Sequence, residues 1–242
     1  MLAVFKRELF SFLNSLMAYI TIGIFLLACG LMFWFFPDTS ILEYGYAEMD
    51  GFFSLVPYLF MFLISAICMR SFAEERREGT YVLLATRPLT VMQIIAAKYL
   101  ACVVLVVFAL LPTLVYYYSI SQLGMPKGNI DTGAVIGSYI GLFLLGSAFA
   151  AIGIFASSIT KNQVIAFAVS VFLCFFAYAG FNAVSKIAGF AAVENMLSNL
   201  GIAEHYQSIS RGVLDSRDVV YFLSFVTLFL GFTKLTLGGR KW

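Results

Sequence analysis

Apolar residues dominate the chain in long runs that short polar segments separate. Six of these runs approach the roughly 20 residues that a helix needs to cross a bilayer core about 30 Å thick. They cover residues 16–36, 54–69, 99–120, 134–159, 163–184 and 219–237. The second run is the shortest, and Pro57 near its beginning suits the first turn of a helix. The pattern predicts an all-α, polytopic membrane protein with six transmembrane helices in a single domain, residues 1–242.

A different pattern precedes the first run, in residues 1–15. Apolar side chains recur there at helical spacing, and Lys6, Arg7 and Glu8 interrupt them instead of preceding them as in a cleaved signal peptide. This spacing predicts an amphipathic helix that lies on the membrane surface before the first span. The alternative is a frayed cytoplasmic tail.

Composition supports the assignment to a membrane. Hydrophobic residues make up 62% of the 242 residues and charged residues 12%, whereas a soluble domain has roughly half and a quarter. The mean hydropathy is +0.94, and a chain this short needs a polar exterior in water. The net charge of +2 is too small to indicate nucleic acid as a partner.

Cysteine and histidine give little sign of metal or redox chemistry. The four cysteines lie inside apolar runs without CxxC spacing, so we expect no disulfides. His205 is the only histidine and has no carboxylate cluster beside it in the sequence, which excludes a His-rich metal site. We expect it to be a solvated or capping loop residue.

The basic residues predict the orientation, because cytoplasmic loops carry an excess of Lys and Arg. With the N-terminus inside, eleven of the fifteen lie on the cytoplasmic side: Lys6, Arg7, Arg70, Arg76, Arg77, Arg87, Lys98, Lys161, Lys234, Arg240 and Lys241. The other four lie outside: Lys127, Lys186, Arg211 and Arg217. An even number of spans then places both termini in the cytoplasm.

Three polar segments are long enough to carry a function. The first outer loop, PDTSILEYGYAEMDG, contains four acids, no base and several aromatic residues, as expected of a short excursion into the membrane interface. Residues 70–98 form the densest charge cluster, on the cytoplasmic side. Residues 185–217 form an external segment in which Phe190, Val193, Leu197 and Leu200 share one helical face. This face predicts a short helix that lies against the membrane or dips into it.

Several kinds of machinery are missing from the sequence. The six runs hold no Asp or Glu, which argues against an ion-coupled carrier. No G-x-x-x-x-G-K-[ST] sequence is present, so ATP and Mg²⁺ are expected in a partner and no cofactor in this chain. The EExxxR motif of prenyl-type intramembrane proteases fails at Gly79, and a rhomboid-type serine mechanism fails because Gly146-Ser147 is followed by Ala148 and no membrane histidine exists. We expect no enzymatic activity.

The loop over residues 70–98 begins with the charged helix SFAEERREG, turns at Gly79-Thr80, and re-enters the bilayer with TVMQIIAAKYL. A compact helix with an apolar face and a basic flank is a good docking surface for a soluble protein. The alternative is a solvated helix end with i,i+3 and i,i+4 ion pairs, each worth a few tenths of a kcal/mol.

This loop resembles that of the permease subunits of type 2 ABC transporters, which reads R-x-x-x-E-E-x-x-x-G-T-x-x-x-L-L-x-x-R-P. The matching positions here are Arg70, Glu74, Glu75, Gly79, Thr80, Leu84, Arg87 and Pro88. The final segment, SRGVLDSRDVVYFLSFVTLFLGFTKLTLGGRKW, resembles the family's closing phrase and sixth span. Among subgroups, the chain is most similar to the gliding-motility-associated permeases, or GldF-like proteins.

The resemblance implies that two permease subunits pair, as a homodimer or heterodimer, in the bacterial inner membrane, and that each receives a cytoplasmic ATPase. It implies a coupling helix between the second and third spans, with these contact residues: Glu74, Glu75, Arg76, Arg77, Glu78, Gly79, Thr80, Leu84, Arg87 and Pro88. Gly79 would allow the turn and Pro88 would stop the helix. The region from Lys186 to Arg211 would correspond to an external gate, where an accessory extracytoplasmic protein could bind.

The alternative function is a non-transporting membrane scaffold or mechanical anchor of an envelope or motility complex. The sequence does not identify a substrate, because apolar spans suit both a lipid cargo and packing against lipid. The small residues Gly137, Gly141, Gly146 and Ala150 predict close packing of the fourth span, within one subunit or at a dimer seam. Pro112 predicts a kink in the third span.

Overall fold

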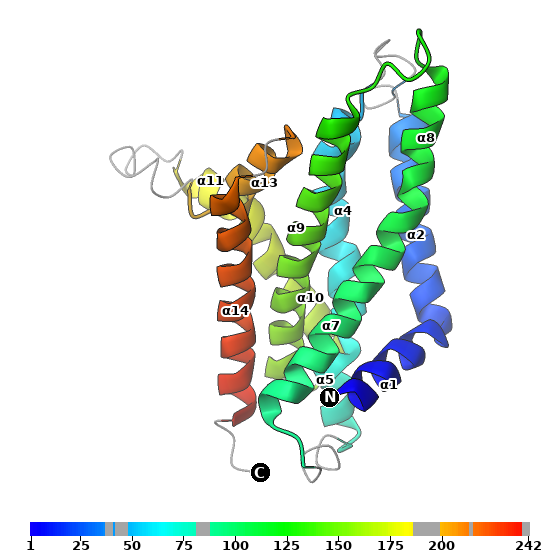
Figure 1. The fold of residues 1–242 in the computed structure, drawn as a ribbon. Coiled ribbons are helices and arrows are strands. Elements are labelled where there is room, and N and C mark those ends of the chain that lie inside the picture. The colour runs from blue at the N-terminus through cyan, green and yellow to red at the C-terminus, as the bar shows by residue number, and fades with distance from the viewer. Residues whose placement is uncertain (37–40, 42–47, 81–87, 186–198, 213–214, 239–242) are drawn as a thin grey trace.

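The computed structural model describes residues 1–36, 41, 48–80, 88–185, 199–212 and 215–238, and no strand occurs among them. The helices are α1 (Leu2–Leu13), α2 (Leu16–Trp34), α4 (Asp50–Cys68), α5 (Arg70–Arg77), α7 (Val91–Leu110), η1 (Leu111–Thr113), α8 (Leu114–Leu123), α9 (Thr132–Ile159), α10 (Gln163–Phe175), η2 (Phe176–Gly180), α11 (Phe181–Ser185), α13 (Ile202–Ser210) and α14 (Ser216–Gly238). They form an elongated bundle (Figure 1). The all-α prediction is confirmed.

Among the described residues, six helical stretches are long and apolar enough to cross a membrane, as predicted. They run over Leu16–Trp34, Asp50–Arg77, Val91–Leu123, Thr132–Ile159, Gln163–Ser185 and Ser216–Gly238.

The ends of two spans differ from the prediction. The second begins at Asp50, so Pro57 lies inside α4 and not in its first turn. The third begins at Val91, because the Thr90 hydroxyl accepts from the Gln93 amide and the Gln93 side chain accepts from the Thr90 amide. Lys98 therefore lies within a spanning helix and not in a loop.

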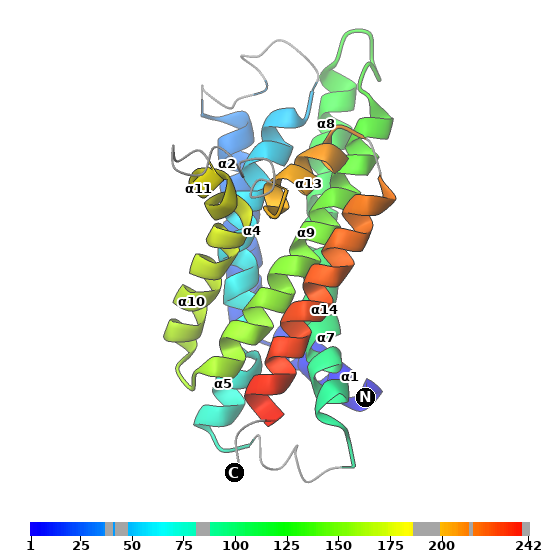
Figure 2. The same cartoon turned by 90° about the vertical axis from the view of Figure 1, so that its left-hand side faces the viewer.

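The fourth span, α9, is the centre of the bundle. Within its most apolar stretch 78% of the residues are buried, against 22% for α2 and for α14 and 33% for α10. It packs against α4, α7, α10, α13 and α14 (Figures 1 and 2). The outer helices thus have exposed apolar faces that lipid or another subunit can cover, whereas α9 is surrounded mostly by protein.

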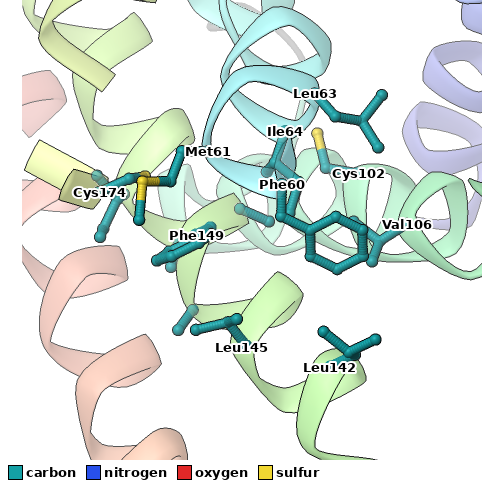
Figure 3. Packing of buried hydrophobic residues seen from close by; sticks show 14 of the residues in the cluster. Phe60, Met61, Leu63, Ile64, Cys102, Val106, Leu142, Leu145, Phe149 and Cys174 are labelled. Carbon is teal, nitrogen blue, oxygen red and sulfur yellow. The ribbon is translucent and has the colours of Figure 1, made fainter. Parts of the chain in front are cut away.

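Small residues make this packing close. A Cβ added to Gly146 would lie 2.7 Å from Val106 Cγ1, and one added to Gly153 would lie 2.5 Å from Cys68 Cβ. The surrounding cluster contains Phe60, Ile64, Leu145 and Phe149 (Figure 3). Small residues of the fourth span were expected to pack either within one subunit or at a dimer seam. Gly146 and Gly153 make their close contacts inside the subunit. The four cysteines are buried and free, as expected.

Pro112 interrupts the third span as predicted. The α-helix ends at Leu110, a 3-10 turn covers Leu111–Thr113, and α8 continues to Leu123. The missing N–H of proline removes a helical hydrogen bond, and the Thr113 hydroxyl donates to the Leu110 carbonyl at 2.7 Å.

The N-terminal segment is the predicted amphipathic helix, α1, so the frayed-tail alternative is wrong. Val4 is buried, Phe5 and Leu9 pack against the core, and Leu2 and Phe10 are exposed. The helix lies across α7 at the end of the bundle that also holds α5 and the end of α14 (Figure 1).

The structure describes only part of the segment over residues 185–217. Most of the expected helical face, Phe190 to Leu200, lies outside the described residues, and α13 follows it at Ile202–Ser210. His205 belongs to this helix and is not a loop residue. Its Nδ1 lies 2.7 Å from Asp218 Oδ1, and its ring stacks on Tyr221 at 3.8 Å between centroids. The histidine thus joins α13 to the start of α14.

Candidate functional site at the charged end of the bundle

Helix α5 extends α4 beyond Met69 and is fixed to α9 by a serine. The backbone amides of Phe72 and Ala73 donate to Ser157 Oγ at 2.9 and 3.0 Å, and the Ser157 hydroxyl donates to the Met69 carbonyl at 3.0 Å. Early amides of a helix lack partners within it. A side chain of α9 supplies these partners, so the beginning of α5 is held by a neighbouring helix.

A cluster of charged side chains, buried at Lys98 and half-exposed at Arg7, joins α5 to α1 and α7. The Lys98 ammonium contacts Glu8 Oε1 and Glu75 Oε1, both at 3.0 Å, and donates to the Ser71 carbonyl at 2.7 Å. Arg7 Nη2 contacts the same two carboxylates at 2.6 and 2.5 Å. Two cations thus face two anions, and the Lys98 side chain is fully buried.

The electrostatics of the cluster favour its charged form. Burial by itself raises the pKa of Glu8, but the charges of Lys98 and Arg7 outweigh it and lower that pKa below its usual value. The Lys98 ammonium also lies 5.0 Å from the centre of the Phe72 ring. Removing the fully buried Lys98 would leave a carboxylate without its partner, which typically costs about 3–5 kcal/mol.

Arg76 forms a second attachment between α5 and α9. Only 6% of this residue is exposed, and its guanidinium donates to the Ser158 carbonyl. The Ser158 hydroxyl in turn lies 2.7 Å from Thr236 Oγ1 of α14. Arg76 is therefore tied to the ends of two spans.

The remaining predicted site residues lie farther out. Arg70 and Glu74 form an i,i+4 ion pair at 2.9 Å, and the Thr80 hydroxyl lies 3.4 Å from the Glu75 carbonyl. Gly79 has φ +73, a left-handed conformation that ends α5 with the expected turn.

Exposure divides the predicted contact residues into two sets. The exposed ones are Arg77, Glu78, Gly79 and Pro88. Glu75 and Arg76 face inward and hold α5 in place. Arg70 and Glu74 form an i,i+4 pair of the kind that the alternative of a solvated helix end expected. Leu84 and Arg87 lie outside the described residues.

Sequence reasoning missed three residues that support this site: Glu8, Lys98 and Ser157. The signal for Lys98 was the Thr90–Gln93 capping pair, which places it two turns inside a helix. Groups of three or more metal-binding side chains are absent from the part of the chain that the structure describes.

The match to a known family decides what kind of protein this is. Residues 35–237 match the model of the family described as ABC-2 family transporter protein. The chain belongs to the ABC-2 family. An ABC-2 protein is the membrane-spanning permease component of an ABC transporter, so this chain is a multi-pass transport component. The match covers most of the chain and includes α5.

No curated protein matches this ABC-2 chain. The family match also does not separate the gliding-motility permeases from other ABC-2 proteins. The narrower subgroup therefore rests on the sequence resemblance alone.

Proposed function

We propose that this permease receives a separate cytoplasmic ATPase at the end of α5 and in the loop that follows, and that ATP-driven movement of the ATPase displaces α5. One observation carries the proposal. Helix α5 is attached to α1, α7 and α9 through buried contacts, while Arg77, Glu78 and Gly79 at its end are exposed. A force applied to the exposed end would reach the spans, because the attachment is not a flexible one.

The proposal assigns different roles to the two sets of residues. The exposed set (Arg77, Glu78, Gly79 and Pro88) would contact the ATPase, with Glu74, Thr80, Leu84 and Arg87 beside it. Glu75 and Arg76 would instead transmit movement, since their side chains already have partners inside the subunit.

The wider assembly follows the same proposal. The charged end would face the cytoplasm of a bacterial cell, two permease subunits would pair in its inner membrane, and ATP and Mg²⁺ would bind to the ATPase. The eleven basic residues that the sequence assigns to the cytoplasmic side support the orientation. A role in gliding motility and an accessory extracytoplasmic protein are the finer parts of the proposal.

Copurification of the ATPase with the tagged permease tests the contact. We expect the double charge reversal Arg77→Glu with Glu78→Lys to reduce the bound ATPase strongly, because both side chains are exposed and few internal contacts depend on them. Deletion of residues 79–90 should abolish binding while the protein still inserts. Lys127→Glu, an exposed charge near the opposite end, is the matched control. Full retention of the ATPase by the deletion variant would refute the docking site.

The rate of ATP hydrolysis distinguishes coupling from a scaffold role. We expect Glu75→Gln to leave the ATPase bound but to uncouple its hydrolysis from the state of the permease, because the Lys98 and Arg7 contacts are weakened. A scaffold would bind the ATPase without changing its rate in either the parent or the variant.

A further inference from the structure

The other end of the bundle contains a cavity of about 780 Å³, among α4, α13, η2 and the beginning of α9. Polar and aromatic side chains line it together. Asp50 and Ser54 come from α4, Tyr178 from η2, Gln207 from α13, and Arg211 from the end of that helix. A cavity of this size is in the range of small-molecule sites.

The charged side chains that line this cavity are not paired with each other, unlike those at the charged end. Asp50 and Arg211 are both exposed, and neither forms an ion pair with any residue that the structure describes. One cavity wall thus offers a carboxylate and another offers a guanidinium. A ligand that carries both a cation and an anion would complement the two, and Arg suits a phosphate in particular.

Tyr178 adds an independent sign of a ligand. Only 5% of its surface is exposed, yet its hydroxyl has no hydrogen-bond partner among the described residues. The neighbouring Tyr206 differs, because its hydroxyl donates to the Phe53 carbonyl at 2.7 Å. The Tyr178 hydroxyl is not among the buried polar atoms that lack a partner, so it is accessible, and Tyr178 lines the cavity where a ligand could supply a partner.

The backbone at Tyr178 is also unusual. Residues Phe176–Gly180 form the π-helical turn η2 inside the fifth span. Such widened turns are less stable than an α-helix and often mark functional sites. This turn places the Tyr178 ring 5.6 Å from Tyr58 and 6.3 Å from Tyr206, between centroids.

A second cavity of about 530 Å³ adjoins the first, and Tyr58 lines both. It lies between α4 and α10, and its other lining side chains are all apolar, among them Met61, Phe62 and Phe172. The lining therefore changes along α4 from charged at Asp50 to apolar at Phe62. These two positions are about 18 Å apart along the helix.

We propose that the two cavities together bind a zwitterionic phospholipid. Its phosphate lies at Arg211, its ammonium at Asp50, and an acyl chain runs past Tyr58 into the apolar cavity. A soluble zwitterion would leave the apolar cavity unused, and an anionic lipid would leave Asp50 without a partner. This inference names the class of substrate that the permease would transport, so the role of the lipid rests on the proposed function. Binding of the lipid needs no ATPase.

Lipid binding to the purified chain tests the site. Nanodiscs of phosphatidylethanolamine and of phosphatidylglycerol are compared as competitors for a fluorescent phosphatidylethanolamine probe. We expect the zwitterionic lipid to compete better, and Arg211→Gln or Asp50→Asn to weaken probe binding about tenfold. The exchange Asp50→Arg with Arg211→Asp should restore part of the affinity. Glu204→Gln removes an exposed carboxylate of α13 outside the cavity lining and is the control.

Three outcomes would overturn the proposal. They are equal competition by the two lipids, unchanged binding in both single variants, and full competition by soluble phosphoethanolamine, which lacks the chain for the apolar cavity. Tyr178→Phe keeps the ring and should weaken binding a few-fold if the hydroxyl contacts the head group. If the protein binds the lipid but does not retain the ATPase, only the docking site is refuted. If it retains the ATPase but does not bind the lipid, only the lipid site is refuted.

Discussion

The two ends of the bundle use charge in opposite ways. At the charged end, Lys98 contacts both Glu8 and Glu75, so these charges are paired within the subunit. At the end with the tyrosine-lined cavity, Asp50 and Arg211 have no ionic partner among the described residues. Charges that are paired inside a protein fix elements relative to one another, whereas charges left exposed beside a cavity are available to a ligand.

This difference explains why one end suits transmission and the other suits binding. Movement at a docking site is useful only if the docked helix is attached to the spans. A ligand site needs groups whose partners are supplied from outside. Charged residues make up only 12% of the chain. Those at the charged end attach α5 to the spans, and those beside the cavity would bind a ligand.

The largest expected effect is at Lys98. Replacement by Met keeps much of the side-chain volume but leaves Glu8 and Glu75 close together with only Arg7 to balance them. We expect a loss of about 3–5 kcal/mol in the free energy of unfolding, measured by denaturation in detergent. Lys234→Met, on the exposed face of α14, should change it by less than about 0.5 kcal/mol. Equal losses of unfolding free energy in the two variants would mean that the Lys98 cluster does not hold α5 to α1 and α7.

A smaller effect is expected at Gly137, where α9 meets α13. An added Cβ would lie 2.9 Å from the Gly212 Cα, and a backbone atom cannot rotate away as a side chain can. Gly137→Ala should therefore cost about 1–3 kcal/mol and displace α13, with weaker lipid binding at the cavity.

The matched control is Gly231→Ala in α14, where nothing lies within 4 Å of the added atom. That substitution should be neutral or slightly stabilising, since Ala is the better helix former. ATPase retention should be the same in both variants, because neither changes a residue of the docking site. A loss of ATPase in Gly137→Ala alone would show that displacement of α13 is transmitted along α9 to α5.

The smallest effect is a dependence on pH at the charged end. The folded pKa of Glu8 is below its ordinary value of 4.5, so the charged carboxylate stabilises the fold above about pH 4.5. This contribution is lost as the pH falls through the lowered pKa. We expect amide exchange in α1 to accelerate below that range. Glu8→Gln should remove this part of the pH dependence, and an unchanged profile would exclude Glu8 as its cause.

The sequence was sufficient to predict the spans and α1, because apolar length and helical periodicity are local properties. It also predicted the turn at Gly79, where only one residue type adopts the conformation easily. The burial of Lys98 was not predictable, because its partner Glu8 lies far away in the sequence and on another helix.

The tyrosine-lined cavity was missed for a similar reason. Asp50 and Arg211 lie in segments that were each assigned to the outside, but only the packing of α13 on α9 brings them to one cavity. The π-helical turn at Tyr178 has no residue pattern that distinguishes it from the surrounding apolar helix. Helix α13 itself begins after Gly201, where a periodic segment was expected to end.

Helix α9 connects the two ends in a way that limits how they can move. Ser157 and Ser158 at its last turn hold α5, and near its first turn Ser138 donates to the Ser210 carbonyl of α13 at 2.8 Å. Its 28 residues form one uninterrupted rod about 42 Å long. A displacement of α5 would therefore be transmitted along α9 to α13, because α9 has no hinge that could absorb it. The cavity wall formed by α13 would then move together with the docking helix.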